Sequence, residues 1–376
     1  MSDTAAAAPA VDRNAARFAA ASQWRLMWWS FRRHKLAMIG LFVTLAIYIV
    51  ALAPDFFSVS DPIRQNARSV YHPPQIGLLH FFDEGSFRPH VYGMTLRRDP
   101  VTLAPTFVPD PSRKIYLGLF VQGYEYNLLG LFPVETHLFG PVDPRQNIYL
   151  FGADRLGRDV WSRIMAGAQI SMSIGLVGVF MSLLIGIVLG GISGYYGGGI
   201  DFAIQRTIEF ILALPQIPIW LALAAALPQN WPATYTYFMI TVILSLVGWA
   251  QLARVVRGRF LSLRTEDFVV AARLDGASEM RIIFRQMLPS FMSHIVASVT
   301  LAIPAMILAE TALSFLGLGL QPPVVSWGVL LREAQNVRSI ATAPWLFAPG
   351  AAVVIAVLAL NFLGDGLRDA ADPYQK

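Results

Sequence analysis

The chain has 376 residues, of which 55% are hydrophobic and only 14% are charged, and its formal net charge is +5. With a mean hydropathy of +0.51 it is far more apolar than a water-soluble globular domain, so the composition predicts a membrane protein. The sequence contains no cysteine, which excludes disulfides, thiolate metal sites and thiol nucleophiles.

The first 35 residues form a polar segment, and the first apolar run follows at residues 36–53. Ala51-Leu52-Ala53 at its end imitates the cleavage site of a signal peptide. However, a run of about 18 residues exceeds the core of about 7–15 residues in a signal peptide and matches a membrane-spanning helix. We therefore expect a tail at 1–35 and a retained first transmembrane helix at 36–53.

Residues 54–150 form a long insert that is rich in proline and aromatic residues. A strand-like pattern covers 114–121, and Pro109-Asp110-Pro111 and Gly123 are typical turn residues. The insert is expected to be a small, mainly β domain outside the membrane. The sequence leaves open whether it is a docking platform for a receptor or a cap over a pathway.

A compact charged group follows the insert directly. It consists of Asp154, Arg155, Arg158 and Asp159, with Gly157 between them. Interleaved charges of both signs predict a salt-bridged hairpin at the outer membrane surface. Binding of a ligand carboxylate by the two arginines is the less favoured alternative.

Apolar stretches long enough to cross roughly 30 Å of hydrocarbon recur after the insert. Together with the first helix they lie at 36–53, 170–192, 204–227, 237–256, 291–315 and 345–363. The sequence therefore predicts an all-α polytopic membrane protein with six transmembrane helices and a small β-rich extracytoplasmic insert. Five of the helices form a core at 151–364.

Glycine and proline mark two of these spans. Gly186, Gly190 and Gly194 repeat every fourth residue and predict a smooth face for close helix packing, which is favoured over a role in gating. Pro215 and Pro218 remove backbone donors and predict a kink in the third span. Such a kink is compatible both with a moving pathway wall and with a static bundle.

Residues 267–289 read DFVVAARLDGASEMRIIFRQMLP and predict two short helices that break at Gly276. Ser278 can cap the second helix, and Pro289 is expected to end it. This helix places an Ile-Ile-Phe run between two arginines, so it is expected to lie along the membrane surface and present a knob to a soluble partner. An ordinary amphipathic surface helix is the alternative.

The acidic residues nearest the spans are Glu209 and Glu310, and a carboxylate at membrane depth normally faces a cavity or a partner. Glu310 precedes a Gly-rich, Pro-containing turn at 315–327. A structural hydrogen bond that holds this turn is an equally supported alternative to a functional role. Candidate contacts with a translocation pathway or an extracytoplasmic receptor are Glu310, Phe315, Leu316, Gly317 and Trp327.

The positions of lysine and arginine predict the orientation, because these residues concentrate in cytoplasmic segments. Those before the first span are Arg13, Arg17, Arg25, Arg32, Arg33 and Lys35. The loop at 257–290 carries Arg257, Arg259, Arg264, Arg273, Arg281 and Arg285. Six spans place both groups on one side, so we expect cytoplasmic N- and C-terminal tails, the latter at 365–376, and a lipid bilayer rather than nucleic acid as the partner of the basic residues.

Signatures of catalysis are missing from the sequence, which contains no G-x-x-x-x-G-K-[ST], H-E-x-x-H or G-x-S-x-G pattern. The six histidines are scattered, which disfavours a metal site. We therefore assign no catalytic residue and expect no cofactor in this chain. An ion-coupled secondary carrier is disfavoured because the span centres are nearly free of ionisable residues, and a membrane-embedded enzyme because no polar cluster converges.

The segment 267–289 resembles the cytoplasmic loop of membrane subunits of bacterial ATP-binding-cassette importers, which carries a Glu-Ala-Ala, Gly and Leu-Pro signature. Val270 replaces the Glu of that signature and Gln286 replaces an aliphatic residue. Binding of a partner is therefore expected to depend on the shape of this loop more than on a carboxylate. The matching residues are Ala271, Ala272, Gly276, Leu288 and Pro289.

Four further stretches resemble the C-type permease subunits of dipeptide and oligopeptide importers, the peptide/nickel family. They read FGADRLGRDVWSRI from Phe151, GISGYYGGGID from Gly191, ETALSFLGLGLQPPVVSWG from Glu310 and LGDGLRDAADP from Leu363. The long insert exceeds what most such subunits carry and marks a sub-branch.

This resemblance implies a type I importer fold and a permease that carries di- and oligopeptides across the bacterial inner membrane, with oligosaccharides or sugar conjugates as the alternative cargo. It implies a second homologous permease, two ATP-binding-cassette ATPases that bind ATP and Mg, and an extracytoplasmic solute-binding protein. The ATPase-coupling residues that it implies are Ala271, Ala272, Asp275, Gly276, Ser278, Arg281, Leu288 and Pro289.

Overall fold

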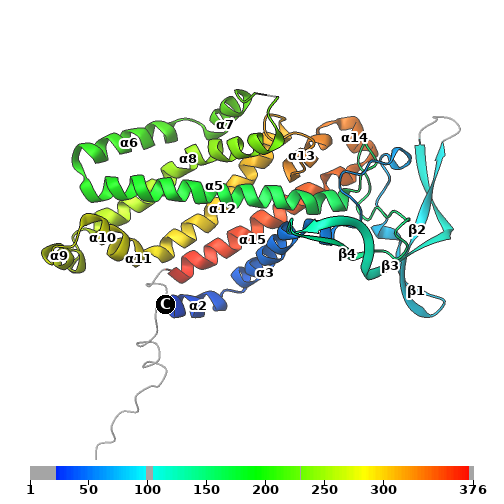
Figure 1. The fold of residues 1–376 in the computed structure, drawn as a ribbon, viewed down its shortest axis with the longest axis horizontal. Coiled ribbons are helices and arrows are strands. Elements are labelled where there is room, and N and C mark those ends of the chain that lie inside the picture. Colours follow the sequence, from blue (N-terminus) through cyan, green and yellow to red (C-terminus); the bar gives the residue numbers. More distant parts are fainter. Residues whose placement is uncertain (1–22, 99–104, 229, 372–376) are drawn as a thin grey trace, which may run out of the picture.

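The computed structural model describes residues 23–98, 105–228 and 230–371. A bundle of long helices lies along the molecule and meets a four-stranded sheet at one end (Figure 1). The segment at 267–289 lies at the other end of the bundle (Figure 1). The architecture is mostly helical with one small antiparallel sheet, as the sequence predicts.

The chain enters the bundle through two consecutive helices, α2 (Gln23–Arg33) and α3 (Lys35–Leu52). His34 separates them and accepts a hydrogen bond at Nδ1 from the N–H of Ala37, which caps α3. The predicted helix at 36–53 is confirmed, whereas the expected tail at 1–35 contains α2, and its first 22 residues lie outside the described part. A short helix, α4 (Pro54–Phe57), follows α3.

The helices α5 (Val160–Tyr196) and α8 (Ala233–Leu263) pack along each other more extensively than any other pair of elements in the described ranges. The predicted glycine face makes this contact. A Cβ at Gly186 would lie 2.9 Å from Cβ of Leu252, and one at Gly190 would lie 2.5 Å from the carbonyl oxygen of Ala253. The two backbones therefore approach at a distance that no other residue permits.

The predicted third span, at 204–227, is not one helix. It consists of α6 (Gly198–Ala213) and α7 (Gln216–Ala225), which meet at an angle of 87°. The break lies where the sequence predicts a kink, because a residue before proline is forced out of the helical region, and Leu214 before Pro215 has φ −87° and ψ 140°. Pro218 lies in the first turn of α7, where its missing N–H costs nothing.

The C-terminal half contains one further long helix before the turn, α12 (Met292–Phe315), and one after it, α15 (Ala348–Ala371). Helix α15 continues to residue 371, so the expected C-terminal tail at 365–376 is helical up to that point. Five helices of the described ranges are long and apolar enough to cross a membrane, and the bent pair could supply a sixth span. Shorter elements between α12 and α15 are α13 (Trp327–Arg332), η4 (Glu333–Gln335), α14 (Val337–Thr342) and η5 (Pro344–Phe347).

The insert forms an antiparallel sheet in the order β1-β2-β3-β4, with β1 (Leu79–Asp83), β2 (Ser86–Arg98), β3 (Pro105–Leu128) and β4 (Phe132–Pro141). The expected strand at 114–121 lies within β3. Two short helical turns, η1 (Ala67–Ser69) and η2 (Ile76–Leu78), precede the sheet.

The predicted turns inside the insert are wrong. Pro109-Asp110-Pro111 and Gly123 lie within β3, at the two places where the pairing register shifts. Proline and glycine therefore mark bulges here rather than chain reversals. The strands instead reverse at Gly85 and Gly130, both of which have positive φ.

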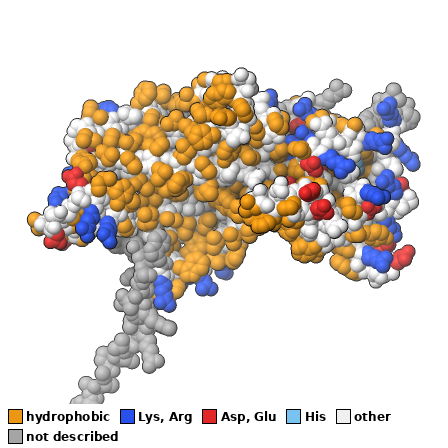
Figure 2. All heavy atoms as spheres, in the orientation of Figure 1, with side chains coloured by type: hydrophobic (Ala, Val, Ile, Leu, Met, Phe, Trp, Pro, Cys, Tyr) orange, Lys and Arg blue, Asp and Glu red, His pale blue; other side chains and the backbone are white. Residues whose placement is uncertain are grey.

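The polarity of the surface changes along the long axis of the molecule. Apolar side chains cover the middle of the bundle, whereas Lys, Arg, Asp and Glu gather at its two ends (Figure 2). Large side chains such as Phe42, Phe180 and Phe210 are exposed on long helices. A broad apolar band between two charged ends is the surface expected of a protein that crosses a bilayer.

We expect Gly190→Ala to destabilise the protein by about 1–3 kcal/mol, because the added methyl group would meet the backbone of Ala253. Gly258→Ala in α8 is the matched control, since a Cβ there meets nothing within 4 Å. Its effect should be neutral or stabilising, because alanine favours a helix more than glycine does. Unfolding midpoints in one mild detergent would measure both variants, and equal midpoints would contradict the close packing.

Candidate functional site

The segment 267–289 forms a helical protrusion at the end of the bundle opposite the sheet (Figure 1). It contains α9 (Asp267–Leu274), α10 (Glu279–Ile282), a π-helical turn η3 (Ile283–Met287) and α11 (Leu288–Ser290). The predicted break at Gly276 is confirmed, and its φ of +75° lies in the left-handed region that glycine adopts without strain.

The backbone closes the end of α9. Gly276 N–H donates to the carbonyl of Arg273 at 3.1 Å, and Ala277 N–H donates to that of Ala272 at 3.0 Å. These two bonds form a Schellman motif, which satisfies carbonyls that would otherwise lack partners. Ser278 occupies the N-cap position of α10, but its side chain makes no capping hydrogen bond.

Two expectations about the second helix are wrong. Helical turns continue through Pro289 to Ser290, because proline in the first turn of α11 needs no N–H partner, and the break lies at Phe291 instead. Ile282 and Ile283 do not lie on a membrane surface. They are buried in a cluster with Phe260 and other apolar residues of the bundle, so this helix is attached through its own core.

The protrusion exposes large apolar side chains among its charged residues. Leu274 is 84% exposed and Met280 is 62% exposed. We define the exposed apolar side chains of this segment as the outer face; they are Phe268, Val270, Leu274, Met280 and Phe284. Several large apolar side chains exposed on one short segment are typical of a contact surface.

The predicted coupling residues divide between the surface and the interior. Ala272 is buried and Leu288 is half-buried, so their side chains stabilise the protrusion itself. Sequence reasoning missed Leu274 and Met280, although apolar residues on both sides of a helix break were a usable signal. The exposed members of the predicted set are Ala271, Asp275, Gly276, Ser278, Arg281 and Pro289.

The C-terminal end of α5 contacts this protrusion through two tyrosines. The guanidinium of Arg273 lies 5.6 Å from the ring centroid of Tyr195, and the hydroxyl of Tyr196 donates to Glu279 at 2.7 Å. The protrusion is therefore in direct contact with α5, as well as with α8 and α12 through its buried cluster.

Glu310 on α12 is fully buried, and both of its carboxylate oxygens accept hydrogen bonds from serine hydroxyls. Ser314 and Ser326 donate to Oε1 at 2.8 Å, and Ser171 lies at 3.4 Å from Oε2. Ser326 also caps α13, and Ser171 accepts from the N–H of Trp327. This network connects α5, α12 and the turn at 315–327, which favours the structural alternative for Glu310.

The other candidate contacts of this turn differ in exposure. Leu316 is exposed, and Gly317 has a positive φ beside the guanidinium of Arg332. Phe315 is half-buried. Trp327 is buried, and its indole N–H donates to the carbonyl of Ile164 at 3.0 Å. Of these residues, Leu316 alone presents a large exposed side chain.

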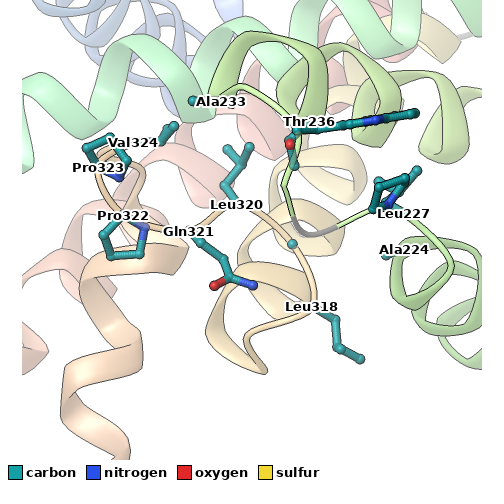
Figure 3. A pocket seen from close by; sticks show the side chains of 13 residues that line it. Ala224, Leu227, Ala233, Thr236, Leu318, Leu320, Gln321, Pro322, Pro323 and Val324 are labelled. Atoms are coloured by element: carbon teal, nitrogen blue, oxygen red, sulfur yellow. The ribbon is translucent and has the colours of Figure 1, made fainter.

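The turn also forms one wall of a cavity of about 150 Å³ (Figure 3). Its opposite wall comes from the connection between α7 and α8, including Leu227 and Trp231, and from the first turn of α8, including Thr236. No local sequence pattern predicts this cavity, because its walls come from segments about 90 residues apart, residues 224–236 and 318–324.

The charged group before α5 forms a bridged hairpin, as predicted, but with different roles for its acids. Asp154 pairs with Arg158 at 2.6 Å and with Arg163 at 3.5 Å. Asp159 makes no such pair within the described ranges and instead caps α5, accepting from the N–H and the hydroxyl of Ser162 at 2.7 and 2.6 Å. The backbone N–H of Arg155 donates to Glu333, which fastens the hairpin to η4.

Two protein families match the chain. "Binding-protein-dependent transport system inner membrane component" matches residues 186–376, and "N-terminal TM domain of oligopeptide transport permease C" matches residues 22–74. The first match includes the protrusion and Glu310. The second includes α2, α3 and α4. The sheet lies between the two matches.

Individual relatives agree with these families. The chain is 40% identical to the dipeptide transport system permease protein DppC of Bacillus subtilis (strain 168) over 225 residues, which is 59% of this chain and 68% of that protein. It is 36% identical over 239 residues to OppC, the oligopeptide permease of the same organism, covering 63% and 76% of the two chains. The oligopeptide permease OppC of Haemophilus influenzae is 33% identical over 274 residues, covering 73% and 79%.

We expect Ser326→Ala to destabilise the protein by about 2 kcal/mol, because it removes a donor to a buried carboxylate and the cap of α13. The matched control is Ser278→Ala at the N-cap of α10, where the side chain makes no capping bond, and its effect should stay within about 0.5 kcal/mol. Unfolding midpoints of the two variants would test this, and equal losses would contradict the network.

Asp159 predicts a pH dependence. Burial raises the pKa of its carboxyl from 3.8 to about 7, so the folded protein retains a proton that the unfolded chain releases. This contribution to stability is complete below about pH 4 and is lost as the pH rises through about 7. Asp159→Asn keeps a capping oxygen without titrating. Its unfolding midpoint should therefore rise relative to that of the wild type between about pH 4 and 8, and a constant difference would contradict the shift.

Proposed function

The chain belongs to the family of binding-protein-dependent transport system inner membrane components, and we propose that it is the permease subunit of an ATP-driven importer of di- and oligopeptides. The relatives described above are named dipeptide and oligopeptide permeases, which supports peptides over oligosaccharides or sugar conjugates as cargo. As a member of this family it is an inner membrane protein with a transport role.

The outer face of the protrusion carries the proposal. It exposes apolar side chains at a tip that is surrounded by arginines, and such a tip needs a soluble protein to cover it. The sequence has no phosphate-binding loop, so ATP and Mg are expected to bind in two partner ATPases. A second homologous permease and an extracytoplasmic solute-binding protein complete the proposed complex.

The path of the chain supports cytoplasmic termini. If α6 and α7 form one bent span, six spans alternate between the protrusion end and the sheet end. The start of α2 and the end of α15 then lie on the side of the protrusion, as Figure 1 draws them. Because the protrusion is rich in arginine, that side is expected to be cytoplasmic and the sheet extracytoplasmic.

The contacts of the protrusion suggest how ATP hydrolysis drives transport. Closure of the ATPases would press on the outer face, and Tyr195 and Tyr196 would pass the displacement to α5. Since α5 and α8 are in close contact, they would move together and rock the bundle between inward and outward openings.

An ion-coupled secondary carrier is the rival from another class. Such carriers use ionisable groups at membrane depth. Glu310 is a buried carboxylate in a spanning helix, but both of its oxygens are held by serine hydroxyls. This arrangement supports a structural role, and the family membership gives the rival no support.

We expect Leu274→Glu to lower ATP-dependent dipeptide uptake at least tenfold in proteoliposomes that contain the chain with its copurified partners. A carboxylate in an apolar contact must lose its water, and each 1.4 kcal/mol of lost coupling corresponds to about tenfold. Val337→Glu is the control, because Val337 is 80% exposed but lies on α14 near the sheet end.

Uptake and ATP hydrolysis would be measured together. Normal dipeptide uptake by a complete complex that carries Leu274→Glu would contradict the proposed coupling role of the outer face. If wild-type complexes accumulated a labelled oligosaccharide but no dipeptide, oligosaccharides would replace peptides as the proposed cargo. A chain that copurifies with no ATPase would contradict the importer itself.

A further inference from the structure

The hairpin formed by β3 and β4 ends in an apolar turn. We define residues 128–132, which read Leu-Leu-Gly-Leu-Phe, as the hairpin tip. Leu129, Leu131 and Phe132 are 59%, 73% and 61% exposed, and none of residues 126–134 is charged. These side chains do not belong to the hydrophobic core of the insert as the structure describes it. The tip therefore presents a concentrated apolar surface that the fold of the insert does not use.

The other hairpin of the sheet, between β1 and β2, shows that the turn itself does not require this composition. Its turn at residues 83–86 reads Asp-Glu-Gly-Ser. In both turns a residue and the glycine after it have positive φ, Glu84 and Gly85 in one and Leu129 and Gly130 in the other. Among residues other than glycine, this conformation favours asparagine and aspartate over a bulky leucine. Turn geometry therefore does not explain the leucines of the tip.

The base of the β3–β4 hairpin is fastened to α4, the short helix that follows α3 directly. The hydroxyl of Tyr124 donates to Oδ1 of Asp55 at 2.8 Å, and Nδ1 of His137 lies 2.7 Å from the carbonyl oxygen of Asp55. The ring centroids of Phe120 and Phe56 are 6.4 Å apart. These contacts hold the hairpin beside the C-terminal end of α3.

From this base the hairpin extends toward the helices. In Figure 1 the hairpin of β3 and β4 runs back toward α3, whereas β1 and β2 lie on the side of the sheet away from the bundle. A strand rises about 3.3 Å per residue, so the tip reaches about 15 Å beyond Tyr124.

Helix α3 shows what the hairpin tip meets there. Its 18 residues are about 27 Å long, close to the thickness of roughly 30 Å of a hydrocarbon core, so its C-terminal end lies near one edge of the hydrocarbon. Large exposed apolar side chains continue along α3 to that end, namely Leu45, Ile49 and Leu52. A tip that turns back past the same end extends this apolar surface and meets the same lipid.

The backbone of the hairpin tip limits how deep it can go. Within the turn, Gly130 N–H donates to the carbonyl of Asn127 and Leu131 N–H to that of Leu128, both at 3.1 Å, which lowers the cost of leaving water. Along this part of the hairpin β3 and β4 pair only with each other among the described strands. Their outer edges still need water or lipid headgroups, so a shallow insertion is favoured over a deep one.

We propose that the hairpin tip enters the lipid leaflet on the sheet side of the membrane and anchors the insert there. Leu129, Leu131 and Phe132 lie among the outer parts of the acyl chains, and the nearest charged residues, Glu125 and Glu135, stay at the level of the headgroups. Interfacial segments bury apolar side chains at this boundary in the same way. The anchor requires neither a peptide cargo nor an ATPase, so it stands or falls separately from the proposed function.

Fluorescence quenching would test the anchor. Because the chain has no cysteine, Leu131→Cys can carry a single fluorescent label on the full chain in lipid nanodiscs, alone and in the reassembled complex. We expect nitroxide groups on the upper acyl chains to quench a label at residue 131 at least threefold more than one at residue 82, and aqueous iodide to show the reverse order. Phe82→Cys is the matched control, because Phe82 is 69% exposed but lies on β1.

A second variant tests the apolar contact itself. Phe132→Glu, added to the labelled Leu131→Cys chain, should lower quenching by nitroxide lipids at least twofold, because a carboxylate resists leaving water. Phe82→Glu in the same background should leave it unchanged. Both substituted side chains are exposed, so equal unfolding midpoints would confirm that the two variants remain folded.

Two results would overturn the proposal. One is equal quenching of the labels at residues 131 and 82 by iodide, which would leave the hairpin tip in water. The other is protection of the label at residue 131 from both quenchers, which would place the tip against protein, whether a second copy of this chain or a partner in the complex.

Discussion

The close approach of α5 to α8 is the contact on which the rest of the structure depends. At Gly186, Gly190 and Gly194 an added Cβ would lie 2.5–2.9 Å from atoms of α8, so the two helices can pack this closely only without side chains. With 37 residues, α5 spans about 55 Å and extends beyond a hydrocarbon core of roughly 30 Å. One of its ends therefore lies at the sheet and the other at the protrusion. A rigid helix held along its length is suited to connect events at these two ends.

Two buried acids near α5 show how similar residues acquire different roles. Glu310 has serine hydroxyls on both oxygens, so its desolvation is offset inside the protein, and the carboxylate connects three segments. Asp159 accepts hydrogen bonds from Ser162 on one oxygen, and its other oxygen is buried without a hydrogen-bond partner among the described residues. The first arrangement offsets the desolvation of both oxygens, whereas the second leaves one oxygen desolvated, in accord with the raised pKa of the Asp159 carboxyl.

The inner face of the protrusion attaches it to the bundle, and its outer face is available to a partner. Its inner face, with Val269, Ile282 and Met287, is buried against the bundle, so the short helices do not depend on a partner to stay in place. Its outer face remains apolar and exposed. Val270, which replaces the acidic residue of the importer signature, is part of that outer face. A partner is therefore expected to recognise the shape and apolar area of the tip, in accord with the importance of the turn at Gly276.

The sequence by itself determined the features that depend on local patterns. The lengths of apolar runs predicted the spanning helices, the four-residue spacing of Gly186, Gly190 and Gly194 predicted a packing face, and Gly276 predicted the break in the protrusion. Only the tertiary structure decided how Pro215 divides a predicted span at 87°, because the size of a bend depends on what the two halves pack against. It also decided the partners of Glu310 and the cavity between the turn at 315–327 and the α7–α8 connection. Those residues come from segments up to about 140 residues apart, and no local periodicity records which distant side chains meet in the fold.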